Sequence, residues 1–325
     1  MTARPVTKAR KKDKENGVTQ TKYIPSQNPL DFYISEEKAT YDKQKPFSVY
    51  YDDSEHFIRL LKGDCIETLN HARENSVDMI FADPPYFLSN GGFTCHAGRM
   101  VSVNKGKWDE SKGVVENHKF NLEWLKACKR VLKPNGTIWV SGTTHIIYSI
   151  GFAMQELEYK ILNDIVWYKR NAPPNLSCRY FTHSTEIVLW AAKDKNSKHY
   201  FNYPLMKHFN RDKQMRNLWE FTEDEGSQLV DNLWEISSPS ANEKRFGKHP
   251  TQKPIELLKR IILASTQERD LVLDPFCGSS TTGVAAVLEN RRYVGIDSES
   301  DYLELSRKRL EEAIKRASLR SVVVA

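Results

Sequence analysis

The chain has 325 residues, a formal net charge of +6 and 39% hydrophobic residues, which suits one large globular domain with room for an insertion. It has neither an apolar run of the roughly 20 residues that a membrane helix needs nor an apolar signal segment, so we expect a cytoplasmic protein. The five cysteines are scattered without a CxxC pair, which argues against a zinc site and a disulfide framework.

The positive charge is concentrated at the start of the chain. Residues 1–22 contain seven basic and two acidic side chains, so the remaining residues are almost neutral. We expect residues 1–50 to form a basic, disordered arm. Such an arm can hold phosphate groups without reading sequence, and a merely solvated tail is the alternative interpretation.

From residue 58 onward the chain alternates between short apolar segments and amphipathic segments. The first half, 51–193, predicts strands at 58–64, 77–83, 137–142, 161–169 and 185–193, with helices at 65–74, 120–132 and 145–157. Residues 194–247 are rich in aromatic and charged residues without a clear period, which indicates an insertion. In the last part, 248–325, we predict helices at 254–266, 279–290 and 300–316 and strands at 271–274 and 291–297. This alternation is typical of an α/β domain with a mainly parallel sheet.

The segment LDPFCGSSTTG at 273–283 predicts a strand, a tight turn and a helix. Gly278 is the one glycine before the helix, so the turn is neither GxGxxG nor a phosphate-binding loop. The next strand ends at Asp297, whose carboxylate can accept hydrogen bonds from a ribose diol. Together they indicate an adenosine-type cofactor held through its sugar and base, with a dinucleotide or plain strand–helix geometry as alternatives.

Three segments together resemble the amino-group DNA methyltransferases of the β class: DPPY at 83–86, HPTQKP at 249–254 and DPFCGSSTTG at 274–283, followed by GID. The resemblance extends from about Ile58 to Ala317. Among subgroups, DPPYFLSNGG and NLSCRYFTHSTE most resemble the DpnA type of adenine-N6 methyltransferase.

This resemblance implies a Rossmann-like, S-adenosylmethionine-dependent fold in which the catalytic motif precedes the cofactor turn, and no metal. It implies DNA as partner, GATC as target and a place in a restriction–modification system. Homodimerisation and a cognate endonuclease are further expectations.

When the motif residues of the family are matched to this sequence one by one, the resemblance implies eight cofactor-binding residues: Asp64, Thr251, Lys253, Phe276, Gly278, Ser280, Thr281 and Asp297. Asp297 would lie at the ribose and Asp64 at the adenine end, unless Asp64 only caps the following helix. Thr251 and Lys253 would hold the methionine carboxylate, although Lys253 is also compatible with a solvated position. The family turn often has glycine where this chain has Ser280, and serine is strained there if the backbone requires a positive φ.

The tetrapeptide Asp83-Pro84-Pro85-Tyr86 would carry the chemistry. The amino nitrogen of adenine is a poor nucleophile, and Asp83 with the carbonyl of Pro84 can accept its two hydrogens and direct its lone pair toward a methyl donor. The prolines fix φ near −65° and remove backbone donors. Tyr86 would stack on a base flipped out of the duplex. The alternative is a rigid turn with Tyr86 in the core.

Further residues are expected to contact the DNA. Trp167 would cover the other face of the base, or simply pack in the core. Residues 194–247 would form a target-recognition region or an interaction surface, and the side chains expected to contact DNA are Tyr200, Tyr203, Arg211, Lys213 and Arg216.

Other functions remain open from the sequence: a cytosine-N4 methyltransferase, an RNA methyltransferase, and a catalytically silent DNA-binding or regulatory protein of the same fold. An aspartate at position 83 favours adenine, and this preference rests on the resemblance.

Overall fold

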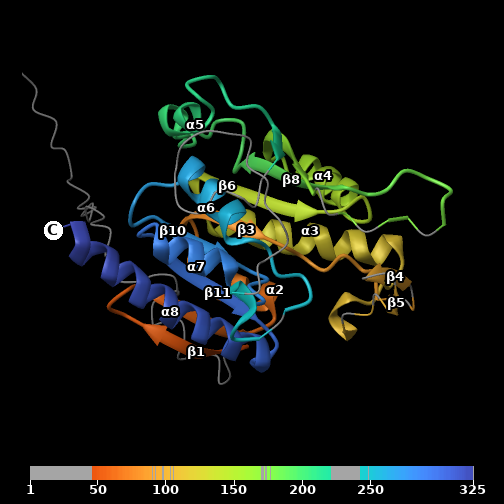
Figure 1. The fold of residues 1–325 in the computed structure, drawn as a ribbon, viewed down its shortest axis with the longest axis horizontal. Coiled ribbons are helices and arrows are strands. Elements are labelled where there is room, and N and C mark those ends of the chain that lie inside the picture. Colours follow the sequence, from red (N-terminus) through yellow and green to blue (C-terminus); the bar gives the residue numbers. More distant parts are fainter. Residues whose placement is uncertain are drawn as a thin grey trace, which may run out of the picture.

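The computed structural model describes residues 46–89, 91, 93–96, 99–102, 104, 106–169, 172, 174–175, 177–220, 242–247 and 249–324. Within these residues a nine-stranded sheet runs in the order β1-β2-β11-β10-β3-β6-β8-β7-β9 (Figure 1). None of the helices in these ranges is long and apolar enough to cross a membrane.

Five adjacent parallel strands form the centre of the sheet: β2 (Ile58–Gly63), β11 (Arg292–Asp297), β10 (Leu271–Asp274), β3 (Val77–Ala82) and β6 (Leu132–Gly142). On one side the antiparallel strand β1 (Phe47–Asp53) pairs with β2. On the other side lie β8 (Thr185–Ala192), antiparallel to β6, then β7 (Lys160–Tyr168) and β9 (Leu218–Glu220). The expected α/β fold with a mainly parallel sheet is confirmed.

Helices cover both faces of this sheet (Figure 1). On one face lie α2 (Cys65–His71), α3 (Val114–Val131) and α4 (Ile147–Glu156). On the other face lie α6 (Ile255–Ser265), α7 (Thr281–Leu288) and α8 (Ser300–Val324). Because both faces are covered, the central strands are buried at most consecutive positions rather than at alternate ones, and all four residues of β10 are buried.

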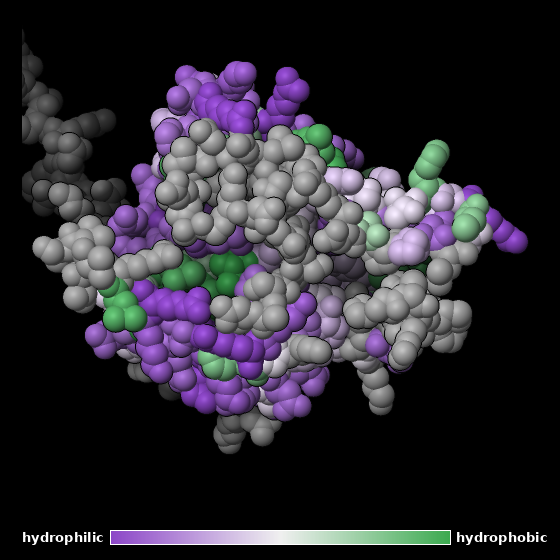
Figure 2. All heavy atoms as spheres, in the orientation of Figure 1, coloured by the Kyte–Doolittle hydropathy of each residue, from purple (hydrophilic) through white to green (hydrophobic). Residues whose placement is uncertain are grey.

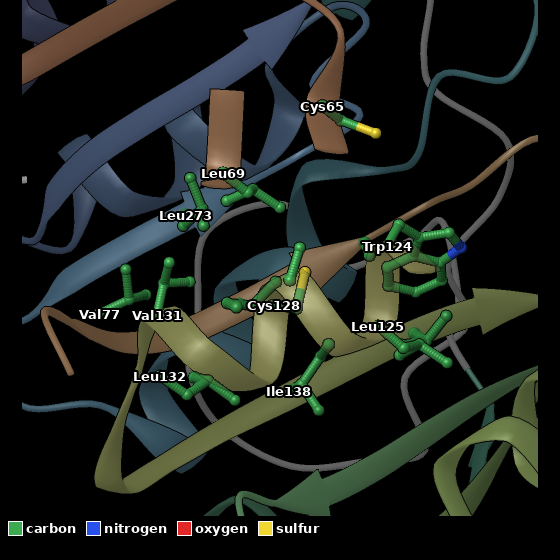
Figure 3. Packing of buried hydrophobic residues seen from close by; sticks show 14 of the residues in the cluster. Cys65, Leu69, Val77, Trp124, Leu125, Cys128, Val131, Leu132, Ile138 and Leu273 are labelled. Carbon is green, nitrogen blue, oxygen red and sulfur yellow. The ribbon is translucent and has the colours of Figure 1, made fainter. Parts of the chain in front are cut away.

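The packing of α3 illustrates how the sequence selects this arrangement. Its buried side chains include Trp124, Cys128 and Val131, which recur at helical spacing. They belong to the same buried cluster as Val77 of β3 and Ile138 of β6, and the side chains of the helix point toward these strands in Figure 3.

Some elements have no clear sequence signal: the edge strands β1 and β9, the hairpin β4 (Phe93–His96) and β5 (Arg99–Ser102), the helix α5 (Tyr203–Phe209), and the 3-10 helices η2 (Lys107–Asp109) and η3 (Asn242–Lys244). Strand β1 begins at Phe47, inside the range 1–50 assigned to the arm, because it is a partly exposed edge strand without regular alternation. The rest of that arm lies outside the described residues. Helix α3 begins six residues earlier than the apolar stripe predicts, and its first residues Val114 and Val115 are exposed.

The order of the strands brings two distant segments together. Strand β3 pairs with β10, so the residues after Ala82 and after Asp274 meet at one edge, the carboxyl edge of the parallel strands. Helix α5 lies near the opposite edge, because the amide of Asn202 donates to the carbonyl of Ala264 near the end of α6. A site built from strand ends therefore forms at the carboxyl edge, away from α5.

Tyr293 of β11 is packed against two glycines, and this contact gives a test of the fold. A Cβ at Gly283 would lie 2.4 Å from Cε1 of Tyr293, and a Cβ at Gly295 would lie 2.6 Å from its hydroxyl oxygen. The ring is fully buried, so it has no room to move away. Gly283→Ala is therefore expected to lower the free energy of unfolding by about 1–3 kcal/mol in urea denaturation.

The matched control for this prediction is Gly151→Ala in α4. A Cβ there would make only an ordinary contact of 3.7 Å with Leu189, and alanine favours the helix by about 1 kcal/mol. Equal stability of the Gly283→Ala variant and the unmodified protein would contradict the packing described.

Candidate active site

A cavity of about 280 Å³ opens at the carboxyl edge of the sheet. Its walls come from the ends of β2, β3, β10 and β11 and from the segment before α6. Of the residues predicted from sequence, those that line it are Asp64, Asp83, Pro84, Pro85, Tyr86, Thr251, Lys253, Phe276, Gly278, Thr281 and Asp297. The segments that carry the three motifs thus meet at one cavity.

The DPPY segment is held in place by a buried carboxylate that sequence analysis missed. Oδ1 of Asp109 accepts hydrogen bonds from the amides of Tyr86 and Phe87, both at 2.8 Å. Its Oδ2 accepts from the amide of Leu88 at 3.2 Å and from the hydroxyl of Ser89 at 2.9 Å. Asp109 therefore satisfies three consecutive backbone donors directly after the two prolines, and it fixes the path of the loop that carries Asp83.

Asp83, Tyr86 and Glu186 form a chain of close oxygen atoms. The phenol oxygen of Tyr86 lies 2.8 Å from Oδ1 of Asp83 and 2.5 Å from Oε1 of Glu186. A phenol has one proton, so both contacts are hydrogen bonds only when one of the two carboxyl groups also carries a proton.

The electrostatics decide which carboxyl group holds that proton more readily. Burial raises the pKa of Asp83 above its ordinary value, Lys253 opposes this rise, and Glu186 adds to it. Burial would also raise the pKa of Glu186, but Lys253 and Lys169 together hold this pKa well below its ordinary value. Of the two acids, Asp83 therefore has the raised pKa and Glu186 the lowered one.

Lys253 lies between the two acids. Its ammonium group donates to Oδ2 of Asp83 at 2.6 Å and lies 3.1 Å from Oε1 of Glu186. Burial alone would lower the pKa of Lys253, but the two carboxylates raise it above its ordinary value. Glu186 has a second cationic partner in Lys169, which pairs with Oε2. The contact of Lys253 with the cofactor carboxylate stays a prediction. The contacts of Lys253 with Asp83 and Glu186 give it a further role, which is to hold Asp83 in place.

The turn after β10 provides the opposite wall of the cavity. Gly278 has φ +50°, and a Cβ there would lie 2.9 Å from the imidazole of His249. His249 itself packs edge-on against Tyr302 and also lines the cavity. Glycine is thus required at position 278 by both backbone conformation and space.

Asp297 ends β11 beside this turn. Its Oδ2 accepts from the amide of Gly278 at 2.9 Å, and its Oδ1 accepts from the amide of Glu299 at 2.9 Å. Burial raises the pKa of Asp297 to about 6. Each carboxylate oxygen can accept more than one hydrogen bond, so both oxygens can also receive a donor from the cavity.

The turn after β10 is also held from behind by α8. The guanidinium of Arg309 donates to the carbonyl and hydroxyl of Ser279 and, at 3.0 Å, to the hydroxyl of Thr281. Ser306 donates to the carbonyl of Gly278 at 2.7 Å. Arg309 is almost fully buried and carried no recognisable sequence signal.

Ser280 is in the turn but does not line the cavity. It has φ 50° and ψ 42°, the left-handed region in which an L-residue is strained, so the condition for strain stated from the sequence is met. Its hydroxyl makes no helix cap and instead accepts from Tyr293 at 3.2 Å.

Other predicted residues have two roles or a different place. Asp64 lines the cavity and also caps α2, because its Oδ1 accepts from the amides of Ile66 and Glu67. Phe276 lines the cavity with one face and packs edge-on against Trp124. Trp167 lies buried in the cluster on the α6 face and does not line the cavity, so core packing describes its position.

The predicted DNA-contacting residues after α5 do not line the cavity either. Arg211, Lys213 and Arg216 are followed by β9, which runs parallel to β7. The residues that follow β9, 221–241, lie outside the described ranges.

Glu186 belongs to the site, but the sequence analysis did not identify it. It lies in the apolar strand β8 and is only 3% exposed. In the sequence, the signal for Glu186 is an acidic residue next to an apolar run. An acid in such a position is buried only when partners compensate its charge.

A Rossmann-like sheet with DPPY after one strand and a glycine turn after its neighbour defines an S-adenosylmethionine-dependent amino methyltransferase. Comparison with known proteins agrees with this class: the DNA methylase family, whose model is named for N6 and N4 methyl transfer, matches residues 77–308. The chain belongs to this family, and the resemblance to β-class enzymes of the DpnA type is confirmed.

Curated relatives cover most of the chain. The type II methyltransferase M2.DpnII of Streptococcus pneumoniae is 52% identical over 263 residues, which are 81% of this chain and 92% of that protein. The type II methyltransferase M2.MboI of Moraxella bovis is 48% identical over 263 residues, with 81% and 91% coverage. The protein is thus an S-adenosylmethionine-dependent DNA methyltransferase.

Solved structures give the same class. The M1.HpyAVI–SAM complex is 30% identical, with a TM-score of 0.55, and the match covers 78% of this chain and 98% of that one. The cytosine-N4-specific PvuII DNA methyltransferase has a TM-score of 0.59 at 21% identity, with 81% and 92% coverage, which shows a shared fold.

Removing the carboxylate of Asp109 tests its role in the DPPY segment. Asp109→Ala leaves three backbone amides without their acceptor, and each buried donor that stays unsatisfied costs about 1–3 kcal/mol. We expect methyl transfer to be lost and the free energy of unfolding to fall by a few kcal/mol, measured by urea denaturation and single-turnover assays. Glu110→Ala, at an exposed neighbouring residue, is the control and is expected to change neither quantity. Full activity of Asp109→Ala would refute the anchoring role.

Proposed function

We propose that the protein methylates the N6 amino group of adenine in DNA, with GATC as the target sequence. The proposal is carried by one observation: Asp83 and Pro84 line the same cavity as Gly278 and Asp297. Hydrogen-bond acceptors for an amino group and residues suited to bind a nucleoside thus line the same cavity. The aspartate at the start of the motif favours adenine over cytosine, and the similarity to M2.DpnII and M2.MboI supports a role within a restriction–modification system.

The cavity residues fit S-adenosylmethionine. Asp297 offers carboxylate oxygens to a ribose diol, and Gly278 leaves space for close approach to the backbone. Phe276 presents an apolar ring to the cavity, and Asp64 lies at its rim near the end of β2. Thr251, in the segment before α6, would contact the methionine part together with Lys253. No phosphate-binding loop is needed for such a ligand.

In this proposal the protein residues act mainly by orientation. When bound, the cofactor supplies an electrophilic methyl group. Asp83 and the Pro84 carbonyl accept the two hydrogens of the adenine amino group and direct its lone pair toward that methyl. Lys253 and Glu186 hold Asp83 in place, and Tyr86, whose hydroxyl is fixed by Glu186, offers its ring to the base.

We also keep 194–247 as a proposed target-recognition region, between catalytic and cofactor-binding parts at 51–193 and 248–325. Strand β9 supports this, because it runs parallel to β7 and so leads from the α5 side toward the carboxyl edge. Homodimerisation and action beside an endonuclease, which the family resemblance of the sequence implies, belong to the same proposal.

The deciding experiment is methyl transfer from labelled S-adenosylmethionine to DNA, followed by nucleoside analysis and mapping of the modified positions. We expect N6-methyladenine within GATC. Asp83→Ala is expected to reduce turnover by at least about a hundredfold while cofactor affinity changes little, because the lost group orients the amino nitrogen and does not bind the cofactor. Label recovered as N4-methylcytosine, or only in RNA, would refute the adenine assignment.

The pH dependence of the reaction tests the charge arrangement around Asp83. A protonated Asp83 is a weaker acceptor for the amino hydrogens, so the rate should fall as the pH drops through its raised pKa, at higher pH than for an ordinary aspartate. Glu186→Gln removes a negative charge that helps raise the pKa of Asp83. The acid limb of the rate profile should therefore move to lower pH in single-turnover measurements. A limb that stays in place, or moves to higher pH, would contradict this assignment.

A further inference from the structure

The connection between β7 and β8 leaves the sheet at the edge that carries the active site. Tyr168 at the end of β7 pairs with Thr185 at the start of β8, so residues 169–184 begin and end there. In Figure 1 this segment projects beyond the sheet on the right-hand side. Its two ends are joined directly to the catalytic network, because Lys169 pairs with Glu186, the second residue of β8.

The segment exposes large aromatic side chains. Phe181 is 96% exposed, the highest value among the large hydrophobic residues described, and Tyr180 is 61% exposed. Figure 2 shows green, hydrophobic residues on the right-hand side of the molecule, where this segment projects. An almost completely exposed phenylalanine lowers the solubility of the protein and makes no packing contact within it. A role in binding a partner is therefore the physical explanation to test.

The tip that carries these rings has a defined shape. The amide of Asn175 donates to the carbonyl of Tyr180 at 2.7 Å, and Oδ1 of Asn175 accepts from the amide and hydroxyl of Ser177. The rings of Tyr180 and His183 are 5.6 Å apart. Phe181 is thus presented by a folded tip.

The charge of the segment indicates the partner. Residues 169–184 include Lys169, Arg170 and Arg179 and contain no aspartate or glutamate. Arg179 is exposed next to the aromatic pair. A basic, aromatic projection beside a methyltransferase cavity is complementary to phosphates and to stacked bases.

We propose that this segment enters the DNA and that Phe181 occupies the space left in the base stack when the target adenine turns into the cavity. Arg179 contacts the phosphate backbone beside it. Flipping a base costs a few kcal/mol, mostly through lost stacking, and an inserted aromatic ring replaces part of that stacking. The proposal rests on the proposed function, because it requires the adenine to leave the duplex.

The first test compares Phe181→Ala with the unmodified enzyme on two DNA substrates after the methylated site has been mapped. On matched duplex we expect single-turnover methylation to slow by about tenfold or more, the equivalent of one lost stacking contact. On DNA with a mismatched base opposite the target adenine, the pair is already weakened, so the variant should approach the rate of the unmodified enzyme. 2-Aminopurine at the target position should show reduced fluorescence in the complex of the variant with matched duplex.

Phe152→Ala is the matched control, since Phe152 is another exposed phenylalanine, in α4 on the surface of the domain. It should leave both rates unchanged. An unaltered rate of Phe181→Ala on matched duplex, or equal slowing on both substrates, would overturn the insertion. A failure of the proposed function would show differently, as absence of N6-methyladenine with the unmodified enzyme.

The second test concerns Arg179. Arg179→Gln should weaken binding to matched and mismatched DNA by the same factor and reduce the salt dependence of the binding constant by about one phosphate contact. An unchanged salt dependence would exclude Arg179 as a phosphate contact.

Discussion

The site depends on one interaction above all, the ionic contact of Glu186 with Lys253. In the proposed mechanism Asp83 orients a weak nucleophile from a largely buried position, where the charge of a carboxylate has to be compensated by a cation or by several hydrogen-bond donors. Lys253 is that cation, and Glu186 keeps it in position while also accepting the hydroxyl proton of Tyr86. Three segments far apart in sequence are thereby joined: the loop after β3, the start of β8 and the segment before α6.

The sheet order explains how such distant segments come together. The pairing of β3 with β10 puts the loop that carries Asp83 beside the turn that carries Gly278, although about 190 residues separate them in the chain. Parallel strands place their carboxyl ends at a common edge, so each motif needs only to follow its strand. The order of motifs along the chain is therefore free to vary while the geometry of the site stays the same.

Periodicity and motifs were sufficient for the central strands and the main helices, because those segments bury one or both faces and carry distinctive turns. Of the predicted catalytic and cofactor residues, only Ser280 does not line the cavity. Periodicity and motifs did not predict β1 or α5, whose burial is too partial to give a regular pattern. The roles of Asp109 and Glu186 were not predicted either, since both residues bond to Tyr86, which lies 23 and 100 positions away from them in the chain. Trp167 shows the converse, because an aromatic residue near a motif belonged to the core.

The support of the cofactor turn by α8 has a consequence for synthesis of the protein. Ser306 and Arg309 hold Gly278, Ser279 and Thr281, and they belong to the last helix described. A chain still being translated exposes the DPPY loop and the turn before these supports have left the ribosome. The turn after β10 is therefore held in its described shape only after α8 has been synthesised and has packed behind it.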